Sequence, residues 1–175
     1  MKRLKGEEFV QYIKEHIGDK LKDSKIKLKK AGLAQIQTEA VWLDIDREAI
    51  LDTVRAMKKL DYPLLSVMSG YDAGDHLVIL YHMALYRAVK NGLLHVELVV
   101  RAPKDDLWIP SITGEIPGAA VTEQEKREML GIEVKGLGDM NNVFLPGDFP
   151  KDVFPWRKDE TGVDAKMPKR AGGED

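Results

Sequence analysis

The chain contains no cysteine among its 175 residues. A disulfide, a thiolate-ligated iron–sulfur cluster, a cysteine zinc site and a cysteine nucleophile are therefore all excluded from this sequence. If the protein takes part in redox chemistry, we expect its electron carriers to be bound by other chains.

Long apolar runs are also missing. The most apolar stretch, Leu77–Leu85, is short and contains His82, whereas a membrane-spanning helix needs roughly 20 apolar residues. No apolar segment follows the charged start Met1-Lys2-Arg3-Leu4-Lys5-Gly6, so we expect no secretion signal. Any association with a membrane is expected to be indirect.

An excess of charge of either sign is lacking as well. Charged residues make up 32% of the chain, yet the formal net charge is only -2. This balance gives no electrostatic support for a nucleic-acid partner. The hydrophobic content of 43% is enough for one domain with its own core.

Residues suited to metal or nucleophilic chemistry are few and scattered. None of the histidines has the His-x-x-x-His spacing of a helical zinc site, and one of them is expected on a strand with no carboxylate beside it. We find no Ser-His-Asp pattern and no nucleotide-binding glycine loop. We therefore expect no metal site and no bound cofactor. The histidines are His16, His76, His82 (the one on the strand) and His95.

Periodic patterns in the first 60 residues predict helices and strands in alternation. An apolar stripe over residues 7–21 predicts a helix. Alternation over residues 25–30 and β-rich composition over 33–37 and 40–45 predict strands. Asp46 is then expected to cap a helix that ends near Leu60.

Three further strands are predicted, over Leu64–Ser69, His76–Tyr86 and Leu93–Arg101. The pair Asn91-Gly92 is typical of a tight hairpin turn. Residues 1–103 are therefore predicted to form an α+β domain. Its mixed, largely antiparallel sheet of four to five strands should carry helices on one face.

Residues 104–134 are predicted to form a proline-rich connection with a short capped helix. Thr122 and Glu125 have the spacing of a capping box, which predicts a helix over Glu123–Leu130. Gly131 stands where a left-handed C-cap is expected.

Residues 135–175 show neither helical nor strand periodicity, but they carry large apolar side chains. Such side chains need burial, either on their own domain or in a partner, and a long irregular segment is usually functional or disordered. We interpret this segment as an extended C-terminal arm that wraps a partner subunit. The apolar residues expected to contact the partner are Phe144, Leu145, Phe149, Phe154 and Trp156.

Between Leu60 and Asp159 the sequence resembles the 30 kDa subunit family of respiratory complex I and of related membrane-bound hydrogenases. The resemblance rests on a series of short motifs in a fixed order. These are Leu60-Asp61-Tyr62-Pro63, Leu77–Met83, Val96–Pro103, Ile109–Thr113, Glu123-x-Glu125-x-x-Glu128-Met129-Leu130-Gly131-Ile132, Leu145-Pro146-x-Asp148-Phe149 and Pro155–Asp159.

The sequence departs from the family pattern at several positions. Val121 replaces the usual Trp, Glu128 an Asp, and Leu130 a Phe. The segment Gly136–Asn142 replaces Gly-His-Pro-x-Leu-Arg-Arg and lacks its His and both Arg. These departures favour the archaeal membrane-bound [NiFe] hydrogenase or sulfane sulfur reductase branch. The alternative is the 30 kDa subunit of a quinone-reducing NADH or F420H2 dehydrogenase of the complex I type.

The resemblance implies a non-catalytic assembly subunit that binds no cofactor. Its expected partner is the large [NiFe]-hydrogenase-like subunit, a homologue of the large complex I subunit that holds the quinone site. The [NiFe] centre and the iron–sulfur clusters would lie in this and neighbouring subunits, and membrane subunits would move ions. The chain would sit peripherally on the cytoplasmic face of the cell membrane, held through other subunits.

Several charged residues are further candidates for partner contact. Acidic groups in the first turn of a helix suit its dipole, so the glutamates are expected either to serve their own helix or to meet an Arg or Lys of the partner. The polar end of the arm is expected to make charge-assisted hydrogen bonds to the partner. A small stand-alone enzyme that uses the glutamates, or an adaptor for a soluble protein, are the rival hypotheses. The charged candidates are Glu123, Glu125, Glu128, Arg157, Lys158 and Asp159.

Overall fold

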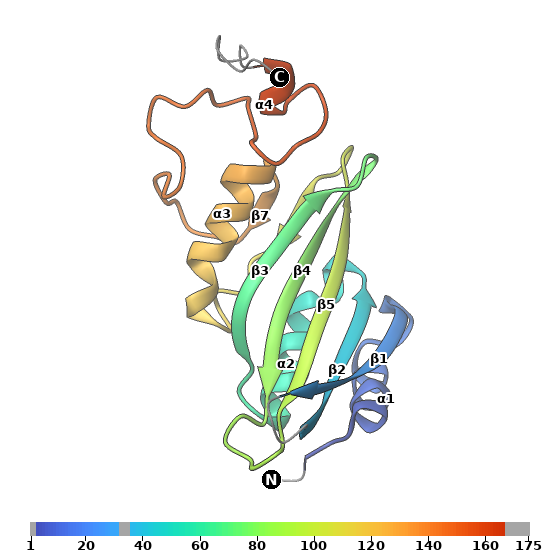
Figure 1. Cartoon of the computed structure of the whole chain (residues 1–175). Helices are drawn as coiled ribbons and strands as arrows, with labels where there is room; N and C mark the ends of the chain where they lie inside the picture. The colour runs from blue at the N-terminus through green and yellow to red at the C-terminus, as the bar shows by residue number, and fades with distance from the viewer. Residues whose placement is uncertain (1–2, 32–35, 167–175) are drawn as a thin grey trace.

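The structure is a computed structural model that describes residues 3–31 and 36–166 (Figure 1). Helix α1 (Gly6–Ile17) leads into β1 (Leu21–Ala31) and β2 (Ile36–Ile45), and α2 (Ile50–Leu60) precedes the next three strands. These strands are β3 (Leu64–Asp72), β4 (His76–Leu85) and β5 (Leu94–Pro103). The remaining elements are β6 (Trp108–Pro110), α3 (Ala120–Leu130), β7 (Glu133–Lys135) and α4 (Val163–Lys166), with short 3-10 turns η1 (Gly18–Lys20), η2 (Arg47–Ala49) and η3 (Pro117–Ala119).

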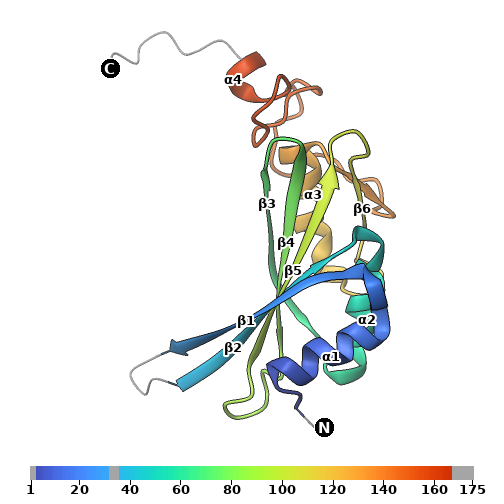
Figure 2. The same ribbon diagram turned by 90° about the vertical axis from the view of Figure 1, so that its right-hand side faces the viewer.

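The main sheet has five strands in the order β1-β2-β5-β4-β3. Only β2 and β5 run parallel, and the other neighbours are antiparallel. Figure 2 shows α1 and α2 against one face of this sheet, while no helix of residues 3–31 and 36–166 covers the opposite face. The predicted α+β class, with a largely antiparallel sheet and helices on one face, is confirmed.

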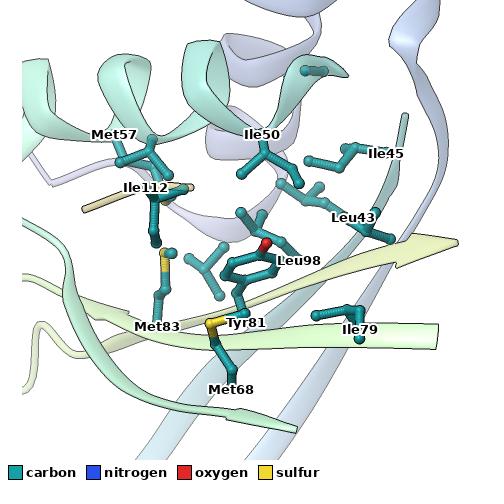
Figure 3. Packing of buried hydrophobic residues seen from close by; sticks show 14 of the residues in the cluster. Leu43, Ile45, Ile50, Met57, Met68, Ile79, Tyr81, Met83, Leu98 and Ile112 are labelled. Atoms are coloured by element: carbon teal, nitrogen blue, oxygen red, sulfur yellow. The ribbon is translucent and has the colours of Figure 1, made fainter. Parts of the chain in front are cut away.

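The core lies between the sheet and its helices because alternate strand residues point the same way. Figure 3 shows Ile50 and Met57 of α2 above Leu98, Tyr81 and Met83 of the sheet. Residues from the segment 104–134 join the same core rather than a separate one, so this segment packs as part of the domain. They are Ile109, Ile112, Ile116, Ala119, Leu130, Ile132 and Val134.

Several predicted boundaries differ from the structure. The first helix ends at Ile17, because Gly18 takes a positive φ of 58° and the chain then enters β1. The side chain of Asp46 makes no capping bond but pairs with Lys22, with 2.7 Å between Nζ and Oδ2. Residues 32–35, which include most of the strand predicted over 33–37, lie outside the described residues.

The predicted tight turn at Asn91-Gly92 is wrong. Strands β4 and β5 are joined by residues 86–93, in which Tyr86 and Asn91 both have positive φ. The predicted capping box is also wrong, because the helix begins earlier, through the 3-10 turn Pro117–Ala119. The Thr122 hydroxyl instead donates to the carbonyl of Ala119 within the helix.

Candidate partner-binding surface

Helix α3 comes unusually close to the edge strand β3. A Cβ atom built on Gly70 would lie 2.8 Å from Cδ1 of Leu130 and 3.0 Å from Cδ1 of Ile79. Only glycine leaves room for this approach. The helix then ends at Gly131, which takes the predicted left-handed C-cap with φ 67°. The end of α3 is thereby fixed against the sheet.

The Phe154 side chain covers this helix end. A Cβ atom on Gly131 would lie 2.6 Å from the ring of Phe154. Glycine is thus required here both by the left-handed backbone and by the aromatic ring. The C-terminal arm consequently returns to its own domain at the end of α3, as Figure 1 also shows.

The carboxylate of Glu128 organises the first part of the arm. It accepts hydrogen bonds from the backbone N–H groups of Val143, Phe144 and Leu145 at 2.8, 2.9 and 2.8 Å, and from Nε2 of Gln124 at 2.7 Å. Burial by itself would raise the pKa of Glu128, but these four donors outweigh it and lower that pKa. Glu128 therefore holds its own chain, and its contact with an Arg of a partner stays a prediction.

The other two glutamates are also engaged within the chain. Glu123 is fully buried and accepts from the Ser111 hydroxyl and the N–H of Ile112, at 2.6 and 2.7 Å. Burial raises its pKa, and the two hydrogen bonds offset only part of that effect. Glu125 pairs with the neighbouring Lys126. The side chain of Glu123 is enclosed by its own chain, and its contact with a partner stays a prediction.

Lys126 is a buried cation that connects α3 to the arm. Its side chain is 1% exposed, and its Nζ lies 4.7 Å from the ring centroid of Trp156. The backbone N–H of Trp156 donates to the carbonyl of Met129 at 2.9 Å. A cation–π contact shielded from water is stronger than an exposed one. It holds Trp156 over the helix while 39% of that residue remains exposed.

A second carboxylate, Asp72 at the end of β3, anchors the last part of the arm. It accepts from the backbone N–H of Lys158, from Nζ of Lys104 and from the N–H of Gly74, all within 2.9 Å. The same Lys104 donates to Asp159 at 2.6 Å. Burial would raise the pKa of both carboxyls, but the hydrogen bonds they accept lower it.

The polar residues at the end of the arm therefore bind their own domain. Arg157 donates to Asp159 at 3.0 Å and to the carbonyl of Leu130 at 3.3 Å. Lys158 contributes its backbone N–H to Asp72. These groups make charge-assisted hydrogen bonds within the chain, and their expected bonds to a partner stay a prediction.

The apolar residues of the arm are divided between the domain and the surface. Leu145, Phe149 and Phe154 are half-buried and line a hollow of about 240 Å3 beside Arg127. Val143 and Phe144 are 53% and 43% exposed. Because Glu128 fixes the backbone of both, the loop presents two large apolar side chains to the outside in a defined conformation. We call this exposed pair the Val143–Phe144 platform.

One group of polar side chains was not predicted from the sequence. Across three strands, Nε2 of His82 lies 2.5 Å from the Ser69 hydroxyl, while its Nδ1 contacts Glu97. The expectation that His82 has no carboxylate beside it is wrong, because β4 pairs with β5 in a register that puts Glu97 opposite. The row resembles a nucleophile with its base, but catalysis also requires donors for an oxyanion. Strand β4, which carries His82, lies between β3 and β5, and its backbone N–H groups bond to these two strands. They are therefore already used and do not serve as donors for an oxyanion.

Neither a metal-binding cluster nor a membrane-spanning helix occurs within the described ranges, 3–31 and 36–166. The His, Asp and Glu residues of these ranges form no group of three that could hold a metal ion. The helices of the same ranges are all too short or too polar to cross a membrane.

Comparison with known proteins gives consistent matches. The membrane-bound hydrogenase subunit beta of Pyrococcus furiosus is 35% identical over 135 residues, which cover 77% of this chain and 78% of that protein. Hydrogenase-4 component G of Escherichia coli is 31% identical over 124 residues, 69% of this chain but only 22% of that protein. The matched region is thus a small part of the longer Escherichia coli relative.

Among solved structures, the fold is similar to a chain in the archaeal membrane-bound sulfane sulfur reductase complex. The TM-score is 0.67 at 20% identity, covering 94% of this chain and 87% of the other. The sequence family described as the 30 Kd subunit of respiratory-chain NADH dehydrogenase matches residues 43–166. The chain belongs to this family of complex I and hydrogenase subunits.

Proposed function

We propose that the chain is a non-catalytic assembly subunit of a membrane-bound, energy-converting oxidoreductase of the complex I-related hydrogenase type. In this proposal it docks on the large [NiFe]-hydrogenase-like subunit, on the cytoplasmic face of the membrane. The [NiFe] centre and the iron–sulfur clusters lie in partner subunits, in keeping with the absence of cysteine here. Electron transfer in those subunits is coupled to ion translocation by membrane subunits.

The observation that carries the proposal is the Val143–Phe144 platform. Apolar side chains on an irregular loop are normally turned inward, yet these two point outward from a backbone that Glu128 holds in place. A preorganised loop loses less conformational entropy when it binds than a mobile one does. Large apolar residues in such a position are typical anchors of protein interfaces.

The longer relative supports a large partner. Only 22% of hydrogenase-4 component G matches this chain, so there the related region is joined to a much longer polypeptide. Regions that are joined in one relative and separate in another commonly contact each other in both. We therefore infer that the large partner of this chain corresponds to the remainder of that relative.

A matched pair of substitutions tests the platform. The full-length chain, tagged and expressed with its neighbouring subunits, is purified and the co-purifying subunits are quantified. Phe144→Asp places a charge in the contact and should reduce retained large subunit by roughly 30-fold, the effect of losing an interface hot spot. Leu28→Asp is the control, because Leu28 is 61% exposed on β1, far from the arm.

The outcomes separate clearly. If Phe144→Asp, Leu28→Asp and the unchanged chain all retain the large subunit equally, the platform is excluded as the docking element. A chain that purifies alone and turns over a substrate by itself would overturn the assembly role. Hydrogenase activity in the purified complex supports the hydrogenase assignment, and quinone reduction supports the alternative.

A further inference from the structure

The helix-free face of the main sheet is concave. One cavity of about 270 Å3 is lined by residues from all five strands, including Lys25 of β1 at one edge and Tyr71 of β3 at the other. Both edge strands can border the same cavity only if the sheet curls around this face, and Figure 2 shows the β1–β2 pair bending out of the plane of the other strands. We call this hollow the sheet trough.

The floor of the sheet trough is apolar. Trp42 of β2, Val99 of β5 and Leu80 of β4 are each only half-buried, and Tyr71 is 50% exposed. Neighbouring side chains that remain this open across a sheet form an apolar patch of the kind that marks interaction sites. The floor thus offers an apolar surface that the described residues leave uncovered.

A buried donor on the floor lacks an acceptor. The indole Nε1 of Trp42 is shielded from solvent and makes no hydrogen bond with the described part of the chain. A buried N–H without a partner is costly, and most such groups in folded proteins are satisfied. The described residues by themselves therefore leave this polar group unsatisfied.

The charges on the rim of the sheet trough favour an anionic ligand. Arg101 is paired with Asp44, so these two charges cancel. Lys27 lies 4.7 Å from the ring centroid of Trp42, and neither it nor Lys25 has a carboxylate partner among the residues described. Asp23 also lines the trough, so three cations (Lys25, Lys27 and Arg101) stand against two carboxylates (Asp23 and Asp44), and the lining is positive by one charge.

We propose that the sheet trough binds a segment of a partner subunit that carries a large apolar side chain next to a carboxylate. The apolar side chain fills the floor between Trp42 and Tyr71, and the carboxylate faces Lys25 and Lys27. This inference rests on the proposed assembly role. It adds a second docking surface, on the open face of the sheet, separate from the Val143–Phe144 platform at the end of α3.

Site-specific photo-crosslinking in the purified complex tests the contact. A benzophenone amino acid replaces Tyr71 in the full-length chain, and in a second protein it replaces Tyr62. The two positions are matched, at 50% and 51% exposed, but Tyr62 lies outside the trough, against Glu115. Irradiation should link position 71 to another subunit at several times the yield from position 62.

Charge reversal supplies a second measurement. Lys25→Glu with Lys27→Glu should weaken retention of that subunit by roughly 30-fold and remove its salt dependence. The matched control is Arg87→Glu with Lys90→Glu, which makes the same change of charge in the exposed stretch 87–91.

The possible results distinguish this inference from the proposed function. If the complex assembles but positions 71 and 62 crosslink equally, the trough is not a docking surface and the assembly role stands. Crosslinks to a second copy, or to the C-terminal residues of the same chain, also overturn the proposed occupant. If no other protein co-purifies even with the unchanged chain, both proposals fail.

Discussion

Glutamates on one helix can have opposite electrostatic roles, and α3 provides a matched pair. Glu123 faces the core, where burial raises its pKa, and Glu128 faces the arm, where its four donors lower it. Both are nearly inaccessible to solvent. Local spacing alone treats them as equivalent acids of one motif, but their surroundings in the fold decide which of the two is stabilised as an anion.

The pair yields a prediction at the residue scale. Glu128→Gln should lower the free energy of unfolding by about 2 kcal/mol, because an amide supplies one acceptor oxygen and turns its NH2 toward backbone donors. Glu123→Gln should cost about 1 kcal/mol or less, since the charged form is already disfavoured at that site. Urea unfolding at pH 7 measures both losses. An unchanged m-value, the slope of unfolding free energy against urea concentration, confirms that only stability has changed. Equal losses for both variants would contradict the assigned roles.

At the scale of elements, the contact between α3 and β3 determines where the arm is attached. Leu130 packs over Gly70, and the next residue, Gly131, begins the turn that Phe154 covers. A shift of α3 away from the sheet would therefore move the arm as well. Close-packed interiors transmit such a displacement because they have few voids to absorb it.

Gly70→Ala tests this contact. The added methyl group would meet Leu130 at 2.8 Å, so we expect a loss of about 1–3 kcal/mol in unfolding free energy. Gly118→Ala is the control, because nothing lies within 4 Å of a Cβ at that position, and it should stay within about 0.5 kcal/mol of the unchanged chain. Combining Gly70→Ala with Leu130→Val should recover part of the loss. Additive effects in that double mutant would show that the two side chains do not meet.

At the scale of the whole molecule, three carboxylates hold the arm to the domain. Asp72, Glu128 and Asp159 all have pKa values lowered by the hydrogen bonds that they accept, against the opposing effect of burial. A carboxylate with a lowered pKa contributes stability that is present above its unfolded pKa, at about 4, and is lost as the pH falls through its folded pKa. The arm should therefore stay attached at neutral pH and loosen in acid.

Hydrogen exchange measures this pH dependence. After correction for intrinsic rates, the amides of residues 143–145 and 158 should lose protection below about pH 4, while those of α2 keep theirs. Asp159→Asn should loosen residue 158 already at pH 7, because Lys104 and Arg157 lose their shared anion. Parallel loss of protection in the arm and in α2 would mean that acid unfolds the whole domain instead of releasing the arm.

Elements with a local sequence pattern could be predicted from the amino-acid sequence. Alternation along residues 76–86 and 93–101 predicted β4 and β5 almost to their ends, and glycine at position 131 predicted the left-handed end of α3. The short motifs between Leu60 and Asp159 indicated the family, because each motif can be read directly from neighbouring residues of one sequence. The aromatic residues of the arm were identified as candidates, but not which of them the domain itself covers.

Contacts between residues far apart in the chain became known only from the folded structure. Asp72 meets Lys158, 86 positions away in the chain, and Glu128 meets a loop 15–17 residues further on. Ser69, His82 and Glu97 are aligned by the registers of three strands, and the trough exists because all five strands curl together. Strand order, register and curvature depend on the packing of the whole core, so no local pattern in the sequence contains them.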